Sequence, residues 1–198
     1  MKKLLLIACI LLISGGFAFG ETLFEKIDRM HEEELHRENF TLIEDSIAST
    51  SNAIEKSELY WRLARTTLEI GDLLEQEGAG EGVMLDTFIE AEEYADEAIS
   101  LNPNSYQGYY WKSANMGRWG ETKGILNSLF KAKPMRNVLR QALEIYPEHP
   151  DSYYVLGIMY RKVPGRPISF GSSNRAVSLG RKAIDAHLVE FEAGEVND

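Results

Sequence analysis

Cysteine is almost absent from this chain, since Cys9 is the only one among its 198 residues. Cys9 lies in an apolar segment near the N-terminus that has the pattern of a leader sequence. A chain processed after that segment would contain no cysteine, which excludes disulfide bonds, thiol catalysis and cysteine-ligated metals. Packing and charge must therefore stabilise the fold.

Positive charge is also scarce, because 21 Lys and Arg residues face 31 Asp and Glu residues. The formal net charge of −10 repels phosphate backbones and anionic lipid surfaces. The sequence therefore predicts no nucleic acid partner, and the excess of acidic residues is explained more simply by solubility than by cation binding.

Strand patterns and catalytic motifs are missing as well. No alternating apolar and polar run extends beyond a few residues. The loop-like segment 165–173 lacks the Gly-Lys-Ser ending of a phosphate-binding loop and the Gly-x-Ser-x-Gly turn of hydrolases. No nucleophile, metal cluster or matched acid–base pair can be assembled, so neither an enzyme nor a cofactor is predicted.

The first twenty residues have the pattern of a secretory signal: two lysines, the apolar run 4–13, and small residues at Ala18 and Gly20. We expect cleavage after Gly20 and an exported, periplasmic protein of a bacterial envelope, with no stable membrane span after processing. A retained anchor and lipid attachment at Cys9 are the alternatives. The apolar run is short for crossing a bilayer, which favours cleavage.

Helical periodicity covers nearly all of the remaining chain and predicts an all-α protein. Helices are expected to end at the glycine-rich break 78–82 and at the turn 102–104. Before residue 102 the predicted helices are Leu23–Arg37, Ser46–Ile54, Ser57–Gln76 and Met84–Leu101.

The segment HEEELH, His31 to His36, is close to a zinc protease motif, but its histidines are five residues apart instead of four. On one continuous helix that spacing places the two imidazoles about 140° apart. The sequence therefore predicts that they do not share a metal. His149 and His187 have no evident partner in the sequence.

A helical stripe near the C-terminus contains a glycine. Tyr153, Leu156, Gly157 and Tyr160 recur at intervals of three and four, so they share one helix face. Glycine costs about 1 kcal/mol of helix propensity relative to alanine. We expect this cost to be offset by a neighbouring helix that approaches too closely for a larger side chain.

Small residues and prolines recur along the chain. Ala98 precedes Pro103, Ala142 precedes Pro147, and Ala183 occupies an equivalent place, with separations of about 40 residues. The pattern predicts units of two helices in which small residues on the second helix allow close packing and the proline ends the pair. Stacked units would share one continuous core.

These residues resemble the tetratricopeptide repeat family. Tyr153, Leu156, Gly157 and Tyr160 match its first-helix positions, and the paired alanines and prolines match its second helix. The resemblance implies a helical-hairpin solenoid of about three irregular repeats with flanking capping helices. We expect a signal at 1–20, N-terminal capping helices at 21–56 and a repeat domain at 57–198. Its long period implies insertions around Trp119–Pro134 and Pro164–Ser173.

A narrower resemblance covers Ala91–Ala186. Trp111, Gly120, the lysines of 131–133 and the segments ALEIYP and LGIMY are similar to a divergent branch of the family. That branch includes regulators of microtubule dynamics and the periplasmic T component of tripartite (TRAP) transporters for organic acids. Microtubule regulation does not transfer to a protein with a bacterial-looking signal. No ligand residue of the T component matches this sequence.

Alignment of the first helices on their tyrosines indicates a concave groove with an aromatic floor and a basic margin. The alternative is that a terminal helix folds back and buries the same aromatics as core. The residues predicted to bind a partner are Trp61, Arg65, Tyr110, Arg118, Tyr154 and Arg161.

Two functions follow from these patterns. The first is a non-catalytic periplasmic scaffold that binds a protein or peptide in the groove. The alternative is a small-ligand-binding T-type component of a transport system, with a solute-binding subunit as partner. An open groove would favour the first and an enclosed apolar channel the second.

Overall fold

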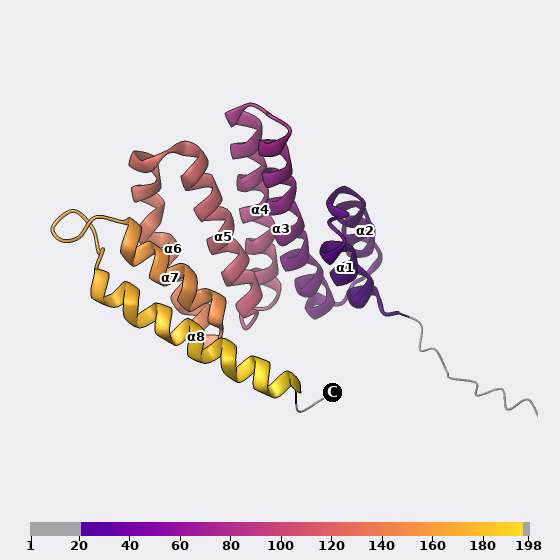
Figure 1. The fold of residues 1–198 in the computed structure, drawn as a ribbon. Helices are drawn as coiled ribbons and strands as arrows, with labels where there is room; N and C mark the ends of the chain where they lie inside the picture. The colour runs from indigo at the N-terminus through magenta and orange to yellow at the C-terminus, as the bar shows by residue number, and fades with distance from the viewer. Residues whose placement is uncertain (1–20, 196–198) are drawn as a thin grey trace, which may run out of the picture.

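The computed structural model describes residues 21–195 and is all-helical over that range, with no strand (Figure 1). The predicted signal at 1–20 lies outside the described residues. In the described part, every helix is too short or too polar to cross a membrane. The helices are α1 (Leu23–Glu32), α2 (His36–Ser49), α3 (Ala53–Gln76), α4 (Glu81–Leu101), α5 (Tyr106–Lys123), α6 (Ile125–Ile145), α7 (Pro150–Lys162) and α8 (Ser173–Glu195).

The helices form hairpins in chain order. Each helix packs against the next, and α3 also contacts α5, so the first helices of successive pairs are neighbours. Figure 1 shows the pairs side by side, from α1–α2 at one end to α7–α8 at the other. The prediction of an all-α, tetratricopeptide-like solenoid is confirmed: three hairpins, α3–α4, α5–α6 and α7–α8, follow an N-terminal pair.

Local polar residues begin several of these helices. Thr22 and Glu25 form a reciprocal capping box at α1, and the Asn52 side chain accepts from the backbone at the start of α3. Pro150 occupies the first turn of α7, where its missing N–H costs nothing. At the start of α8, Ser172 Oγ accepts a hydrogen bond from Arg175 N at 3.4 Å.

The predicted helix Leu23–Arg37 was wrong, because α1 ends at Glu32 and α2 begins at His36. Glu34 takes a left-handed conformation with φ of 57°, and Leu35 N bonds Met30 O at 2.9 Å. The acidic stretch between the helices has no apolar face to bury, so the chain turns there. The predicted second helix Ser46–Ile54 was also wrong, since α2 ends at Ser49 and α3 begins at Ala53.

The predicted insertion Trp119–Pro134 is helical. It lengthens α5 and α6, which are separated only by Gly124 with φ of 92°, and Pro134 lies inside α6. Segment 163–172, in contrast, connects α7 to α8 without regular helix.

The small-residue positions pack as predicted. A Cβ atom added to Gly157 would lie 3.3 Å from the carbonyl oxygen of Ala176 on α8. Ala91, Ala95 and Ala98 on α4 are fully buried. These residues allow the helices to pack closely, as the repeat pattern requires.

Candidate functional site

A largely apolar cavity of about 810 Å³ lies along α5, α6 and α7. Its volume falls in the range of about 300–1,000 Å³ that is typical of ligand sites. The lining residues come mainly from both helices of the second repeat and from the first helix of the third repeat. The apolar members of the lining include Tyr110, Ala114, Met116, Met135, Ile158 and Met159.

Small residues of α5 leave room for this cavity. Ala114 and Gly117 lie on the cavity side, and a Cβ atom added to Gly117 would meet Met135 Cε at 3.1 Å. A larger side chain at either position would fill the space between α5 and its neighbours.

The cations around the cavity are paired with carboxylates. Arg118 Nε donates to Asp72 Oδ1 at 2.6 Å, and its terminal nitrogens donate to Glu75 at 2.7 Å and to Glu121 at 3.1 Å. Lys162 Nζ also donates to Glu121, at 2.9 Å. The rim is therefore close to charge balance, so the predicted basic margin is largely neutralised.

The ion pairs of Arg118 affect the pKa values of the groups involved. Burial alone would lower the pKa of Arg118, but its hydrogen bonds to Glu75 and Asp72 raise it above the ordinary arginine value. Burial raises the pKa of Asp72 despite the same contact. Lys131, which also lines the cavity, pairs with Glu92 and lies 4.6 Å from the centre of the Trp119 ring.

An aromatic cluster adjoins the cavity, which Tyr110 and Trp111 line. The centre of the Tyr110 ring lies 5.1 Å from that of Trp111 and 4.9 Å from that of His149, and both pairs meet edge to face. Tyr106 and Tyr146 also lie against His149. Burial raises the pKa of Tyr110 and lowers that of His149, so both groups are neutral at pH 7.

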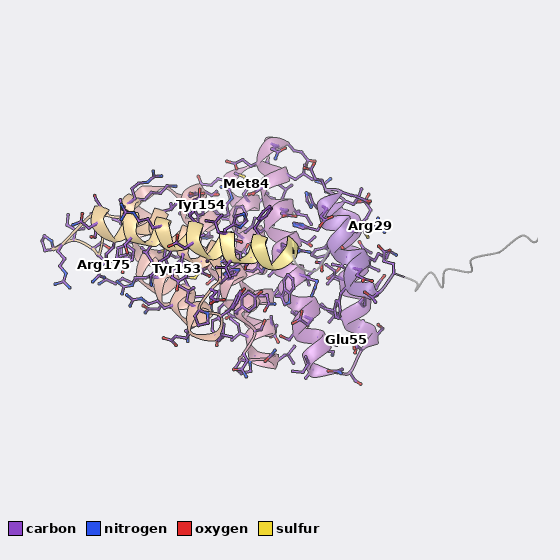
Figure 2. All side chains as sticks on the ribbon, turned by 60° about the horizontal axis from the view of Figure 1, so that its bottom comes forward. Arg29, Glu55, Met84, Tyr153, Tyr154 and Arg175 are labelled. Carbon is purple, nitrogen blue, oxygen red and sulfur yellow. The ribbon has the colours of Figure 1, made fainter. Side chains whose placement is uncertain are left out.

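The structure separates the six residues predicted to bind a partner. Tyr110 and Arg118 line the cavity, whereas Trp61 and Arg65 are buried at the N-terminal end of the molecule. Tyr154, 60% exposed, and Arg161 face solvent on α7. Figure 2 labels Tyr154 where α7 passes behind α8. The six side chains therefore do not form one surface.

Trp61 lies against Arg62 and Arg65, and both arginines bind Asp28 of α1. Arg65 donates to Asp28 Oδ1 on α1 at 2.7 Å, and the Arg62 guanidinium lies 4.1 Å from the centre of the Trp61 ring. Burial opposes ionisation of Asp28, but hydrogen bonds from Arg62 and Arg65 lower its pKa below the usual value. Trp61 and Tyr110 occupy equivalent positions in the repeat alignment, yet Trp61 is core in the first repeat and Tyr110 is cavity wall in the second.

Sequence reasoning missed the contribution of α6. Leu129, Ala132 and Met135 line the cavity, yet the first two belong to the stretch interpreted as an insertion and the third follows it directly. Their spacing of three is the helical signal that could have revealed this. Ala114 and Ile158, which follow Tyr110 and Tyr154 by four residues, also line the cavity.

The structure also brings together His31 and His36, which the sequence predicted to point in different directions. His31 ends α1 and His36 begins α2, so the argument from a single continuous helix fails. One ligand atom from each histidine and one from Glu69 on α3 lie within 4.8 Å of one another.

These features define a tetratricopeptide-like helical solenoid of the kind that binds other proteins. The chain belongs to the family described as regulator of microtubule dynamics protein 1-3, whose model matches residues 23–164.

The relatives match only over part of their length. Regulator of microtubule dynamics protein 1 of Bos taurus is 29% identical over 113 residues, which are 57% of this chain and 35% of the relative. Protein 3 of Rattus norvegicus is 23% identical over 146 residues, 73% of this chain and 30% of the relative. The chain thus spans about a third of the length of the curated relatives it matches.

A solved structure, the crystal structure of MamA, has the same type of fold. It superimposes with a TM-score of 0.52 at 16% identity, covering 87% of this chain and 80% of that chain. At this identity the likeness concerns the fold alone.

Proposed function

We propose that this protein is a non-catalytic scaffold that binds an apolar segment of a partner protein in the cavity of α5, α6 and α7. The observation that carries this proposal is the cavity itself, which has a volume of about 810 Å³ and a largely apolar lining. Burying apolar partner side chains there would contribute about 25 cal/mol for each Å² removed from water.

The charges indicate the chemistry of the partner. Arg118, Lys131 and Lys162 already contact carboxylates of the chain. An acidic peptide would have to compete with these contacts, whereas apolar side chains would not. We therefore expect a segment with two or three adjacent apolar residues, such as one face of an amphipathic helix.

The relatives support a role in protein association. They are named for regulation of microtubule dynamics, and the segment that this chain shares with them is the helical solenoid. We infer that partner binding is the shared property, and that the rest of each relative supplies what the partner is used for.

Export to the periplasm is part of the proposal and rests on the signal pattern of residues 1–20. Expression in a bacterial host followed by N-terminal sequencing tests it. Recovery of a chain that begins at Glu21 would support export, and a chain that keeps residues 1–20 would contradict cleavage.

The transport alternative requires a site for an organic acid. Among the described residues that line the cavity, every cation is already paired with a carboxylate, which leaves no strong site for a ligand carboxylate. Protein binding is therefore the better proposal.

Site-specific photo-crosslinking in cells tests the proposed function. A photoreactive amino acid at Ile158 would point into the cavity, and one at exposed Glu97 on α4 serves as the control. We expect a cross-linked partner at Ile158 but not at Glu97, and loss of that product when Ala114→Trp fills the cavity. Equal products at both positions, or no effect of Ala114→Trp, would contradict the proposal.

A further inference from the structure

Three side chains meet where the N-terminal hairpin contacts the first repeat. His31 Nδ1 and His36 Nδ1 each lie 2.9 Å from Oε2 of Glu69. The side chains are only 27%, 16% and 22% exposed in that order. They come from the end of α1, the start of α2 and the middle of α3, so three separate helices converge there.

The turn between α1 and α2 creates this meeting. Glu34, with φ of 57°, reverses the chain, and Glu34 N bonds His31 O at 3.0 Å. Each histidine then occupies a helix end and faces α3. On an uninterrupted helix the two rings would have pointed apart; here their centres are 6.5 Å from each other.

Hydrogen bonding does not account fully for the arrangement. His31 Nδ1 bonds the Glu69 carboxylate. His36 Nδ1 is buried and forms no hydrogen bond, because its approach to the same oxygen has the wrong direction despite the short distance. A buried imidazole nitrogen without a hydrogen-bond partner is unfavourable. The His36 nitrogen also lies beside the carboxylate that His31 contacts.

We propose that His31, His36 and Glu69 form a binding site for a divalent transition-metal ion of the zinc type. Metal bonds of about 2.0–2.2 Å to imidazole and carboxylate place neighbouring ligand atoms about 3.0–3.4 Å apart. The two nitrogen–oxygen distances of 2.9 Å are close to this range, and all three ligand atoms lie within 4.8 Å of one another, so rotations of the side chains can bring them to one ion. Two imidazoles and one carboxylate suit Zn²⁺, Co²⁺ or Ni²⁺, and water would complete the coordination.

The surrounding charges permit such an ion. Arg65, one turn before Glu69, interacts with it electrostatically, but its guanidinium is bound to Asp28. Asp72, almost one turn after Glu69, adds negative charge to the neighbourhood. The bound ion would fasten the α1–α2 hairpin to α3, which is the helix that begins the repeat stack.

Direct titration tests the site. The full chain is expressed without a histidine tag, purified in chelator-treated buffer and titrated with Zn²⁺ by calorimetry and with Co²⁺ by visible absorption. We expect saturation at one ion per chain and a rise in Tm of about 5–10 °C when Zn²⁺ exceeds Kd a hundredfold. Absence of saturable binding at millimolar metal would overturn the proposal without any variant.

Variants locate the ion. His36→Gln and Glu69→Gln should each weaken Zn²⁺ binding by at least about tenfold, since each removes one of three protein ligands. His187→Gln, at an exposed position on α8, is the matched control and should bind as the unaltered chain does. Unchanged binding by folded His36→Gln, or loss of binding in His187→Gln, would refute this location. His31→Gln gives a third measurement if one variant fails to fold.

Discussion

A Cβ atom added to Gly71 on α3 would lie 2.4 Å from Cε1 of Phe88 on α4. Phe88 is fully buried, and its other neighbours include the Arg118 guanidinium, 5.5 Å from the centre of the ring. The aromatic ring occupies the place of the missing side chain, and this contact sets the separation of the two helices in the first repeat.

Gly71→Ala should therefore destabilise the protein. Overpacking costs about 1–3 kcal/mol, which outweighs the gain of about 1 kcal/mol in helix propensity. Gly180→Ala on α8 is the control, because a Cβ atom there meets nothing within 4 Å; it should leave stability unchanged or raise it. Urea unfolding measures both variants, and equal stabilities would contradict the Gly71 contact.

Trp61 and Tyr154 should respond oppositely to truncation, although the repeat alignment places them at equivalent positions. Trp61 is 7% exposed and Tyr154 is 60% exposed. We expect Trp61→Ala to cost about 3–5 kcal/mol and Tyr154→Ala less than about 0.5 kcal/mol. Thermal unfolding followed by circular dichroism measures both changes. A Trp61→Ala variant as stable as the unaltered chain would show that this ring is not core.

The contrast between these two residues explains what the sequence could predict. The spacing of Tyr153 and Gly157 is local information, so it predicted the helix and its close neighbour. Whether an aromatic residue is wall or core depends on residues elsewhere in the chain. Arg62 and Arg65 lie against Trp61 and are bound by Asp28 of α1. Tyr110 instead lines the cavity. No local pattern contains that packing.

The histidines give a second example. Their predicted separation followed from assuming one helix through 23–37, and a single left-handed residue, Glu34, reversed the outcome. Glutamate rarely takes that conformation, so composition favoured a continuous helix. The cavity wall on α6 was missed because the long repeat period indicated an insertion around Trp119–Pro134, where the chain continues as helix.

Arg118→Gln should weaken the contact between α3 and α5. The substitution leaves Asp72, Glu75 and Glu121 close together without their shared cation. Because the three carboxylate side chains are 37%, 57% and 51% exposed, we expect a loss of only about 1 kcal/mol at pH 7. The free energy of unfolding at two ionic strengths checks this, since screening by salt should reduce the difference. A loss that does not depend on salt would instead indicate lost packing of the arginine stem.

His149 lies among tyrosines where α6 meets α7. Its ring centre is 4.9 Å from that of Tyr110 and 5.0 Å from that of Tyr106, and its Nδ1 lies 2.8 Å from Ser152 Oγ. Burial lowers its pKa from the ordinary value of 6.5, although Asp151 and Glu190 act in the opposite direction. The folded chain therefore binds a proton at this site less readily than the unfolded chain does.

Stability should consequently fall as the pH is lowered from about 6.5 toward the depressed pKa of folded His149. Above pH 6.5 the imidazole is neutral in both states and contributes no pH dependence. His149→Gln removes the titrating group, so the difference in stability between pH 7 and pH 5, measured by urea unfolding, should be smaller in this variant than in the unaltered chain. His187→Gln, which alters an exposed histidine, should keep the full difference. If His149→Gln keeps it too, the proton is taken up elsewhere and the imidazole is not held neutral by its tyrosine neighbours.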